Sequence, residues 1–149
     1  MKLSQMFAHW EQIRTDLFAT IDKFSDEELT YAPYPGCWPV GKLMIHIADC
    51  EDYWLHAVVQ SSLDPNFNYE LADYPTKAAI KELLNRAHER TLALLDSLDE
   101  HNLTEKRQTR RGETFTVGWI IWHVLEHEIH HRGELSMGLG LLGREGLDV

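Results

Sequence analysis

The sequence has few cysteines and no long apolar run, and each shortage excludes a class of protein. Its two cysteines, Cys37 and Cys50, form no C-x-x-C pair, so a disulfide framework is not expected. No stretch of about 18 consecutive apolar residues is present, and we predict no transmembrane helix and no membrane partner. The charged N-terminal segment lacks the unbroken apolar core of a secretory signal. We therefore expect a cytoplasmic protein.

Basic residues are also in short supply. The chain has 14 Lys and Arg against 24 Asp and Glu, which gives a formal net charge of −10. Nucleic-acid binding normally needs a basic face, so we expect no nucleic-acid partner. One basic cluster, Lys106, Arg107, Arg110 and Arg111, falls in a polar segment. We interpret it either as a solvated loop or as a contact for an anionic substrate at the rim of a site.

Helical patterns account for most of the chain. With 149 residues, 44% of them apolar, the sequence is long enough for one domain, which we place at residues 1–149. Apolar residues recur with helical spacing in four segments, at about 3–24, 39–60, 76–98 and 115–139. Evidence for strands is thin, although Arg111-Gly112 is a weak signal for a hairpin turn in an otherwise loop-like stretch. The pattern predicts an all-α fold, a four-helix bundle with long connections.

Histidines are the unusual feature: the chain has nine, and four of them lie between positions 123 and 131. His127 and His131 are four residues apart, so they share one face of the fourth predicted helix and can converge on one metal ion. A catalytic metal site needs a third protein ligand and an open position. On the second predicted helix, His46 lies at the edge of the apolar stripe and fits that role. Cys50, one turn further on, is the soft-ligand alternative, and His123 is a weaker additional candidate.

Two other residues lie where they can assist this site. Glu134 follows His131 by three residues and shares its side of the helix. It is expected either to accept a hydrogen bond from a ligand imidazole or to act as a general base. Tyr53 shares a side of its helix with His46 and is a second candidate catalytic residue. A surface position for Glu134 is the alternative interpretation.

Two segments resemble a known family. The stretch E-H-E-I-H-H-R-G-E at 126–134 and the stretch C-W-P-V-G-K-L-M-I-H-I-A-D at 37–49 resemble the two signatures of the DinB-like superfamily. The resemblance implies a four-helix bundle in up-down-down-up order and a divalent metal ion, with zinc or nickel expected, held by His46, His127 and His131. It also implies a homodimer, and a small-molecule substrate that includes a low-molecular-weight thiol such as bacillithiol or mycothiol.

Three functions remain open from the sequence. The first is a metal-dependent enzyme, a thiol transferase or a hydrolase, in which the metal generates a nucleophile near neutral pH. The second is a stress-related protein that binds a metal or a small molecule without turnover. The third is a structural bundle whose histidines are hydrogen-bonded to carboxylates. Helix 115–139 is apolar on two sides, and the second side carries Trp119, Trp122, Leu125 and Ile129. Either loops or a second subunit covers this side, and we favour a homodimer.

Overall fold

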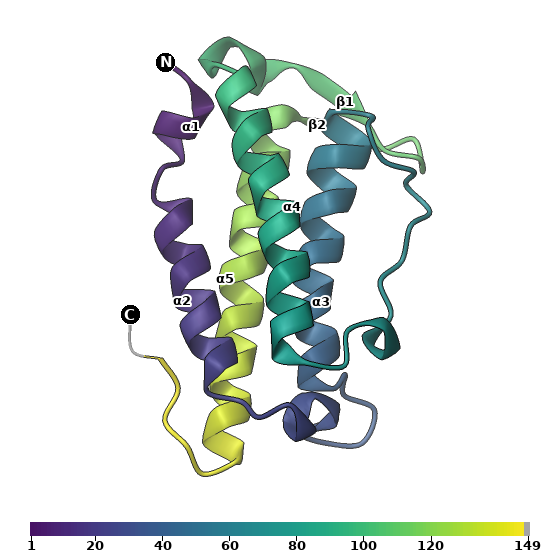
Figure 1. Ribbon diagram of the computed structural model, residues 1–149. Helices are drawn as coiled ribbons and strands as arrows, with labels where there is room; N and C mark the ends of the chain where they lie inside the picture. The colour runs from purple at the N-terminus through teal and green to yellow at the C-terminus, as the bar shows by residue number, and fades with distance from the viewer. Residues whose placement is uncertain (148–149) are drawn as a thin grey trace.

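The computed structural model describes residues 1–147 and confirms the all-α fold expected from the sequence (Figure 1). The long helices are α2 (Trp10–Asp22), α3 (Val40–Glu51), α4 (Lys77–Ser97) and α5 (Val117–Leu141), preceded by the short α1 (Leu3–Met6). Shorter segments connect them: η1 (Glu27–Thr30), the π-helix η2 (Asp52–Val59), η3 (Leu71–Asp73), η4 (Glu100–Thr104) and the strands β1 (Lys106–Gln108) and β2 (Thr114–Thr116). No helix among the described residues is long and apolar enough to cross a membrane.

The four long helices form two parallel pairs. Trp10 contacts Glu128 and Asp16 contacts Arg132, so α2 and α5 run in the same direction. In Figure 1, α3 and α4 run together in the opposite direction, and the long segment 60–76 returns along the length of the bundle to join them. The helix directions therefore follow the order up, down, down, up. Because α3 and α5 are antiparallel neighbours, side chains near the middle of each helix face one another.

The helix ends follow the local sequence. Thr76 caps α4 as predicted, because its hydroxyl accepts a hydrogen bond from the Ala79 amide at 3.2 Å. Thr116 caps α5 in the same way, through the amide of Trp119. Helix α5 thus begins and ends two residues later than the sequence predicted. Two residues after it ends, Gly143 adopts φ +76°, a conformation that favours glycine.

The first predicted helix is interrupted, which corrects the expectation of one helix over 3–24. Helix α1 ends at Met6 and α2 begins at Trp10. The break lets α1 lie against the end of α4, where the Leu3 amide donates to the carbonyl of Leu98 and the Ser4 hydroxyl donates to Asp96. Leu3 is fully buried there. Burial of Leu3 therefore outweighs continuity of the helix.

The second predicted helix changes its pitch. A regular helix over 39–60 would place Trp54 on the same apolar stripe as Ile47 and Cys50. After Glu51 the chain continues as the π-helix η2, so this stripe shifts. Leu55 is buried instead, together with the polar residues Asp52 and His56. The wider turn directs these two residues toward α4, where each has a hydrogen-bonding partner. Trp54 is left half-buried at the edge of the bundle.

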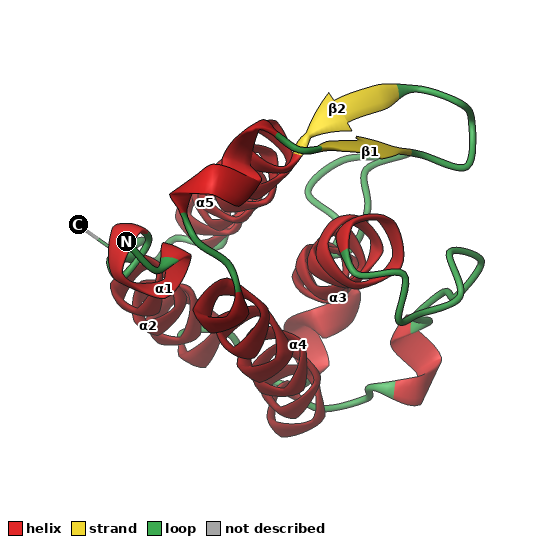
Figure 2. Cartoon of the chain, turned by 90° about the horizontal axis from the view of Figure 1, so that it is seen from above, coloured by secondary structure: helices red, strands yellow, loops and turns green. Residues whose placement is uncertain are grey.

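The predicted hairpin turn is present. Strands β1 and β2 pair antiparallel, and Gly112, with φ +85°, lies in the loop between them. The segment 99–114 is therefore more ordered than the loop expected from its polar sequence, since it also contains η4. Viewed along the bundle, the hairpin lies beside the edge formed by α3 and α5 (Figure 2).

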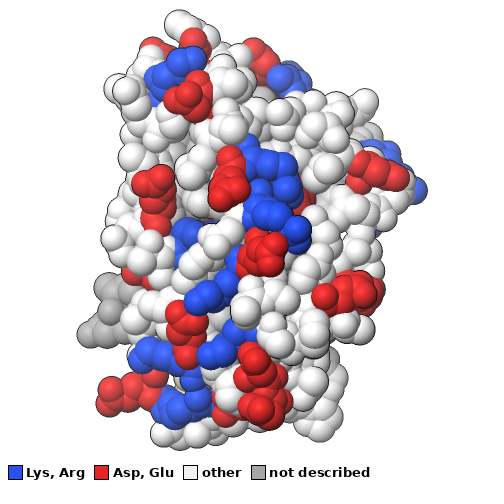
Figure 3. Space-filling view, viewed as in Figure 1, with Lys and Arg blue, Asp and Glu red and all other residues white. Residues whose placement is uncertain are grey.

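Charges of both signs alternate on the outside of the bundle. On the face in Figure 3, Lys and Arg side chains follow one another down the middle, with Asp and Glu beside them. Ion pairs of this kind include Lys81 with Asp22 at 2.7 Å. This mixture agrees with the absence of a basic face in the sequence. Exposed apolar side chains on α5 include Trp119, Trp122 and Ile129, as expected, and the homodimer stays a prediction.

Candidate metal centre

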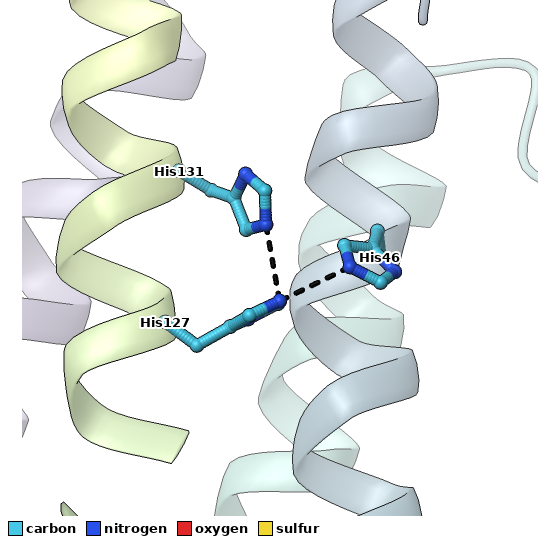
Figure 4. A group of neighbouring side chains, drawn as sticks. All are labelled: His46, His127 and His131. Atoms are coloured by element: carbon cyan, nitrogen blue, oxygen red, sulfur yellow. Dashed lines mark hydrogen bonds between the residues drawn. The ribbon is translucent and has the colours of Figure 1, made fainter. Parts of the chain in front are cut away.

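Three histidines meet between α3 and α5. His127 and His131 lie one turn apart on α5, and His46 faces them from α3 (Figure 4). The Nε2 atom of His127 lies 3.0 Å from Nε2 of His131 and 3.0 Å from Nε2 of His46. The three residues singled out from the sequence are therefore in contact, and one ligand nitrogen from each lies within 4.8 Å of the other two.

The distances fit a divalent transition-metal ion. Metal–nitrogen bonds of about 2.0–2.1 Å in tetrahedral geometry place ligand nitrogens about 3.3 Å apart. The two closest nitrogen pairs here are within a few tenths of an ångström of that value. Small rotations of the histidine side chains can produce a shift of this size without moving the helices. Three protein ligands would leave one position of a tetrahedral ion for a further ligand.

Without a cation, the hydrogen bonding of His127 is incomplete. Its Nδ1 atom is buried and has no partner among the described residues. The Nε2 atom of a neutral imidazole presents either one proton or one lone pair, so it can form a hydrogen bond with only one of its two histidine neighbours. The other 3.0 Å contact is then unsatisfied. A cation bound among the three nitrogens would remove this conflict at Nε2, although Nδ1 would still lack a partner.

The electrostatic environment keeps the imidazoles neutral. Burial, followed by the charge of His131, lowers the pKa of His127 to about 3. Burial, followed by the charge of His131, lowers the pKa of His46 to about 4. Near neutral pH both rings therefore offer lone pairs instead of protons. Neutral imidazole is the form that binds a metal.

Glu134 lies in contact with one of the three histidines. Its carboxylate accepts a hydrogen bond from Nδ1 of His131 at 2.6 Å when that nitrogen is protonated, and Nε2 of the same ring lies in the cluster. His130, on the exposed side of α5, lies 3.5 Å from the other carboxylate oxygen. This carboxylate–histidine arrangement is typical of residues that orient a metal ligand.

The two additional ligand candidates lie outside the three-histidine cluster. His123 stacks on Trp119, with ring centroids 4.8 Å apart, and its ring centroid is 6.2 Å from that of His127. Cys50 is buried, and burial raises the pKa of its thiol. A thiol that holds its proton is a poor metal ligand.

A cavity of about 340 Å³ opens beside the histidines, and Tyr53 lies in its wall. The lining residues come from α3, η2 and α5: His46, Asp49, Cys50, Tyr53, Trp54, His123 and His127. A second cavity, of about 280 Å³, is lined in part by Trp38, His131 and Glu134. Each of the three histidines therefore lines one of the two cavities.

Asp49 is a site residue that the sequence analysis missed. It follows His46 by three residues, a spacing that places the two on neighbouring positions of one helix face. Burial raises the pKa of Asp49 to about 6, against the opposing effect of Lys42. A carboxyl group that titrates near neutral pH in a cavity wall is suited to accept or donate a proton. The spacing from His46 was the signal available in the sequence.

A buried charged cluster was also missed. Arg14 donates to Glu128 and to Glu51, and Glu51 accepts a hydrogen bond from Nδ1 of His88 at 3.0 Å when that nitrogen is protonated. All four side chains are at most 6% exposed. Burial opposes the guanidinium charge, but the two carboxylates outweigh it and raise the pKa of Arg14. The cluster joins α2, α3, α4 and α5 at one level, between two apolar halves of the core.

Comparisons with known proteins agree on the fold. The chain is 28% identical over 140 residues to the uncharacterized protein YizA of Bacillus subtilis, covering 91% of this chain and 84% of YizA. It superposes on a DinB-like protein from Bacillus cereus with a TM-score of 0.77 and 20% identity, over 96% of this chain and 94% of that one.

A more distant match is a mycothiol-dependent maleylpyruvate isomerase. The TM-score is 0.63 at 14% identity, over 88% of this chain and 60% of the isomerase, which shows a shared fold only. The family model of the DinB superfamily matches residues 9–135, and this range includes all three histidines. The chain therefore belongs to the DinB superfamily.

Proposed function

We propose that the protein is a divalent-metal-dependent enzyme that transfers a low-molecular-weight thiol to an electrophilic small molecule. The observation that carries the proposal is the convergence of three imidazole nitrogens, one of them on a ring oriented by Glu134, beside an accessible cavity. His46, His127 and His131 would hold the ion. A divalent ion bound there supplies Lewis acidity, which makes a thiol or a water a nucleophile near neutral pH.

The residues around the cavity have separate roles in this proposal. Asp49 takes the proton that the thiol releases, because its carboxyl group titrates close to neutral pH. Tyr53 hydrogen-bonds the electrophile through its hydroxyl. The sulfur forms a bond to the electrophilic carbon while the leaving group departs with its electron pair. Glu134 is a positioning residue, because its carboxylate is already bound to His131.

Two considerations support thiol transfer over hydrolysis. A solved protein of the same fold, the maleylpyruvate isomerase, is mycothiol-dependent. The cavity wall also combines apolar and aromatic surface with few charges, which suits sulfur better than a water nucleophile. Three imidazole ligands suit zinc and nickel, and we propose one of these two ions as the cofactor.

Metal removal tests the proposal directly. The untagged protein is expected to contain about one equivalent of a transition metal per chain, measured by elemental analysis. It is expected to conjugate cysteine or glutathione to chlorodinitrobenzene, a reaction in which a carbon–sulfur bond forms and chloride leaves. Chelation should lower the conjugation rate at least about tenfold, and added zinc or nickel should restore it. Bound metal without any rate would indicate the non-catalytic binding protein, and no metal uptake would indicate a structural bundle.

Glu134 is expected to act by orienting His131. Glu134→Ala should weaken metal affinity about 10–100-fold, the usual effect of losing such a partner. Glu134→Gln should retain most of the affinity and most of the rate, because the amide oxygen can still accept the bond from Nδ1. Competition with a chromophoric chelator measures the affinity. If Gln and Ala lower the rate equally while Gln preserves the affinity, Glu134 acts as a base instead.

A further inference from the structure

A third cavity, of about 480 Å³, adjoins the cavity beside the histidines. Tyr53 and Trp54 line both of them, so these two side chains form a shared wall. The third cavity continues toward the hairpin, where its lining includes Arg110 and Arg111. The two cavities therefore adjoin at Tyr53 and Trp54, with His46 and His127 lining one and Arg110 and Arg111 lining the other.

The hairpin itself holds these arginines in place. Arg107 donates to the carbonyl of Val59 at 3.1 Å and to Glu105 at 2.7 Å, which fixes the hairpin to the end of η2. Within the loop, the amide of Thr109 donates to the carbonyl of Glu113 at 2.8 Å, and Thr109 is buried. The loop is therefore anchored at its base and closed on itself.

The guanidinium groups of Arg110 and Arg111 do not stabilise the fold through ion pairs among the described residues. Across residues 1–147, no carboxylate oxygen lies within 4.0 Å of either guanidinium, whereas Arg107 in the same basic cluster is paired. Both arginines are exposed, and Glu113 lines the same cavity. Hydrogen bonds from Asn66 and, to a smaller extent, the charge of Arg110 lower the pKa of Asp64, so a second carboxylate lies near the arginines. The cavity thus offers two guanidinium groups that have no direct ion pair among the described residues. Guanidinium groups bind carboxylates and phosphates strongly because their donors match the oxygens of these anions.

We propose that the two adjoining cavities form one substrate site, in which a thiol reaches the histidines while a carboxylate or phosphate of the same molecule binds Arg110 and Arg111. This inference rests on the proposed function for its thiol end. Tyr53 and Trp54 contact the middle of the substrate. The substrate class is therefore an anionic thiol several bonds longer than cysteine.

Two related probes test the anionic end separately from the thiol end. Glutathione carries a thiol and two carboxylates, and S-methylglutathione keeps the carboxylates without a free thiol. Isothermal titration calorimetry of the zinc-loaded protein gives the Kd of each. The double variant Arg110→Ala/Arg111→Ala should weaken binding of both probes about tenfold. Lys106→Ala removes one positive charge from the same hairpin outside the cavity, and it should leave both Kd values unchanged.

The outcomes distinguish the two proposals. If the double variant binds S-methylglutathione as tightly as the wild type does, or if the wild type binds neither probe, the anionic subsite is wrong. If the arginines matter but glutathione binds no better than S-methylglutathione, the subsite stands and the thiol chemistry at the histidines fails. Equal weakening by Lys106→Ala would show a general charge effect and would also overturn the subsite.

Discussion

Replacing His127 with alanine is expected to lower the affinity for zinc or nickel by about 100–1,000-fold. A complete four-ligand zinc site is worth about 10–16 kcal/mol, so one ligand contributes roughly 3–4 kcal/mol. His127 is the central member of the cluster, because its Nε2 atom is the one within 3.0 Å of both His46 and His131. Its loss leaves two nitrogens that do not enclose a site. Elemental analysis and chelator competition measure the change.

His123→Ala is the matched control for this variant. His123 lies one turn before His127 on α5, and its ring stacks on Trp119 away from the cluster. Its removal is expected to leave the metal content at the wild-type value. The metal-free stability of the His127 variant should stay close to that of the wild type, because the ring is half-buried and incompletely hydrogen-bonded. Wild-type metal binding by His127→Ala, or equal losses in both variants, would contradict the three-histidine site.

Replacing Arg14 with alanine is expected to lower the free energy of unfolding by about 3–5 kcal/mol near neutral pH. Arg14 is 4% exposed and donates to Glu51, to Glu128 and to the carbonyl of Leu84. Without it, two carboxylates that are each 1% exposed are left without their cation. Uncompensated buried charge of this kind carries a penalty of about that size. Urea denaturation measures the loss.

The pH dependence of this variant should have the opposite sign from that of the wild type. Burial alone would raise the pKa of Glu51, but Arg14 and His88 outweigh burial and lower it. A carboxyl group whose pKa is lowered by folding stabilises the protein at pH values above its pKa in the unfolded state. This stability is lost as the pH falls through its pKa in the folded state. In Arg14→Ala the pKa of Glu51 rises because its main cationic partner is gone, so the penalty is largest at high pH and is relieved on acidification.

Two further variants serve as controls for Arg14→Ala. Arg86→Ala removes an exposed arginine, paired with Glu82 at 3.9 Å, and should change the stability by no more than about 0.5 kcal/mol. A triple replacement of Arg14, Glu51 and Glu128 by apolar residues of similar volume should recover much of the loss. If Arg14→Ala lowered the free energy of unfolding by no more than Arg86→Ala does, the buried cluster would not contribute to stability as described.

The sequence predicted the histidine cluster because helical periodicity fixes its geometry. A spacing of four places His127 and His131 on one face, and the edge of an apolar stripe places His46 toward a neighbouring helix. These statements need only the rise and rotation of a regular helix. Where the helix is irregular, the same reasoning failed. The π-helix shifted Trp54 from the expected core position to the rim of the cavity.

The buried charged cluster could not be predicted for a different reason. Arg14, Glu51 and Glu128 are each common on helix surfaces, and the sequence does not indicate that their positions meet in space. Their burial depends on how far each of the four helices is shifted along the bundle axis relative to the others. The long connections do not determine these shifts. The break between α1 and α2 has a similar origin, since it depends on a contact with the distant Leu98.

The position of that buried cluster has a consequence for the proposed metal site. Glu51 and Glu128 lie on α3 and α5, the two helices that carry the histidines, and both carboxylates bind the same guanidinium. The side chain of Arg14 therefore restricts how far α3 and α5 can shift past each other. The histidines would then already be in position when an ion binds. Most of the entropy that a flexible site would lose on binding would have been lost in folding, which would favour tight binding.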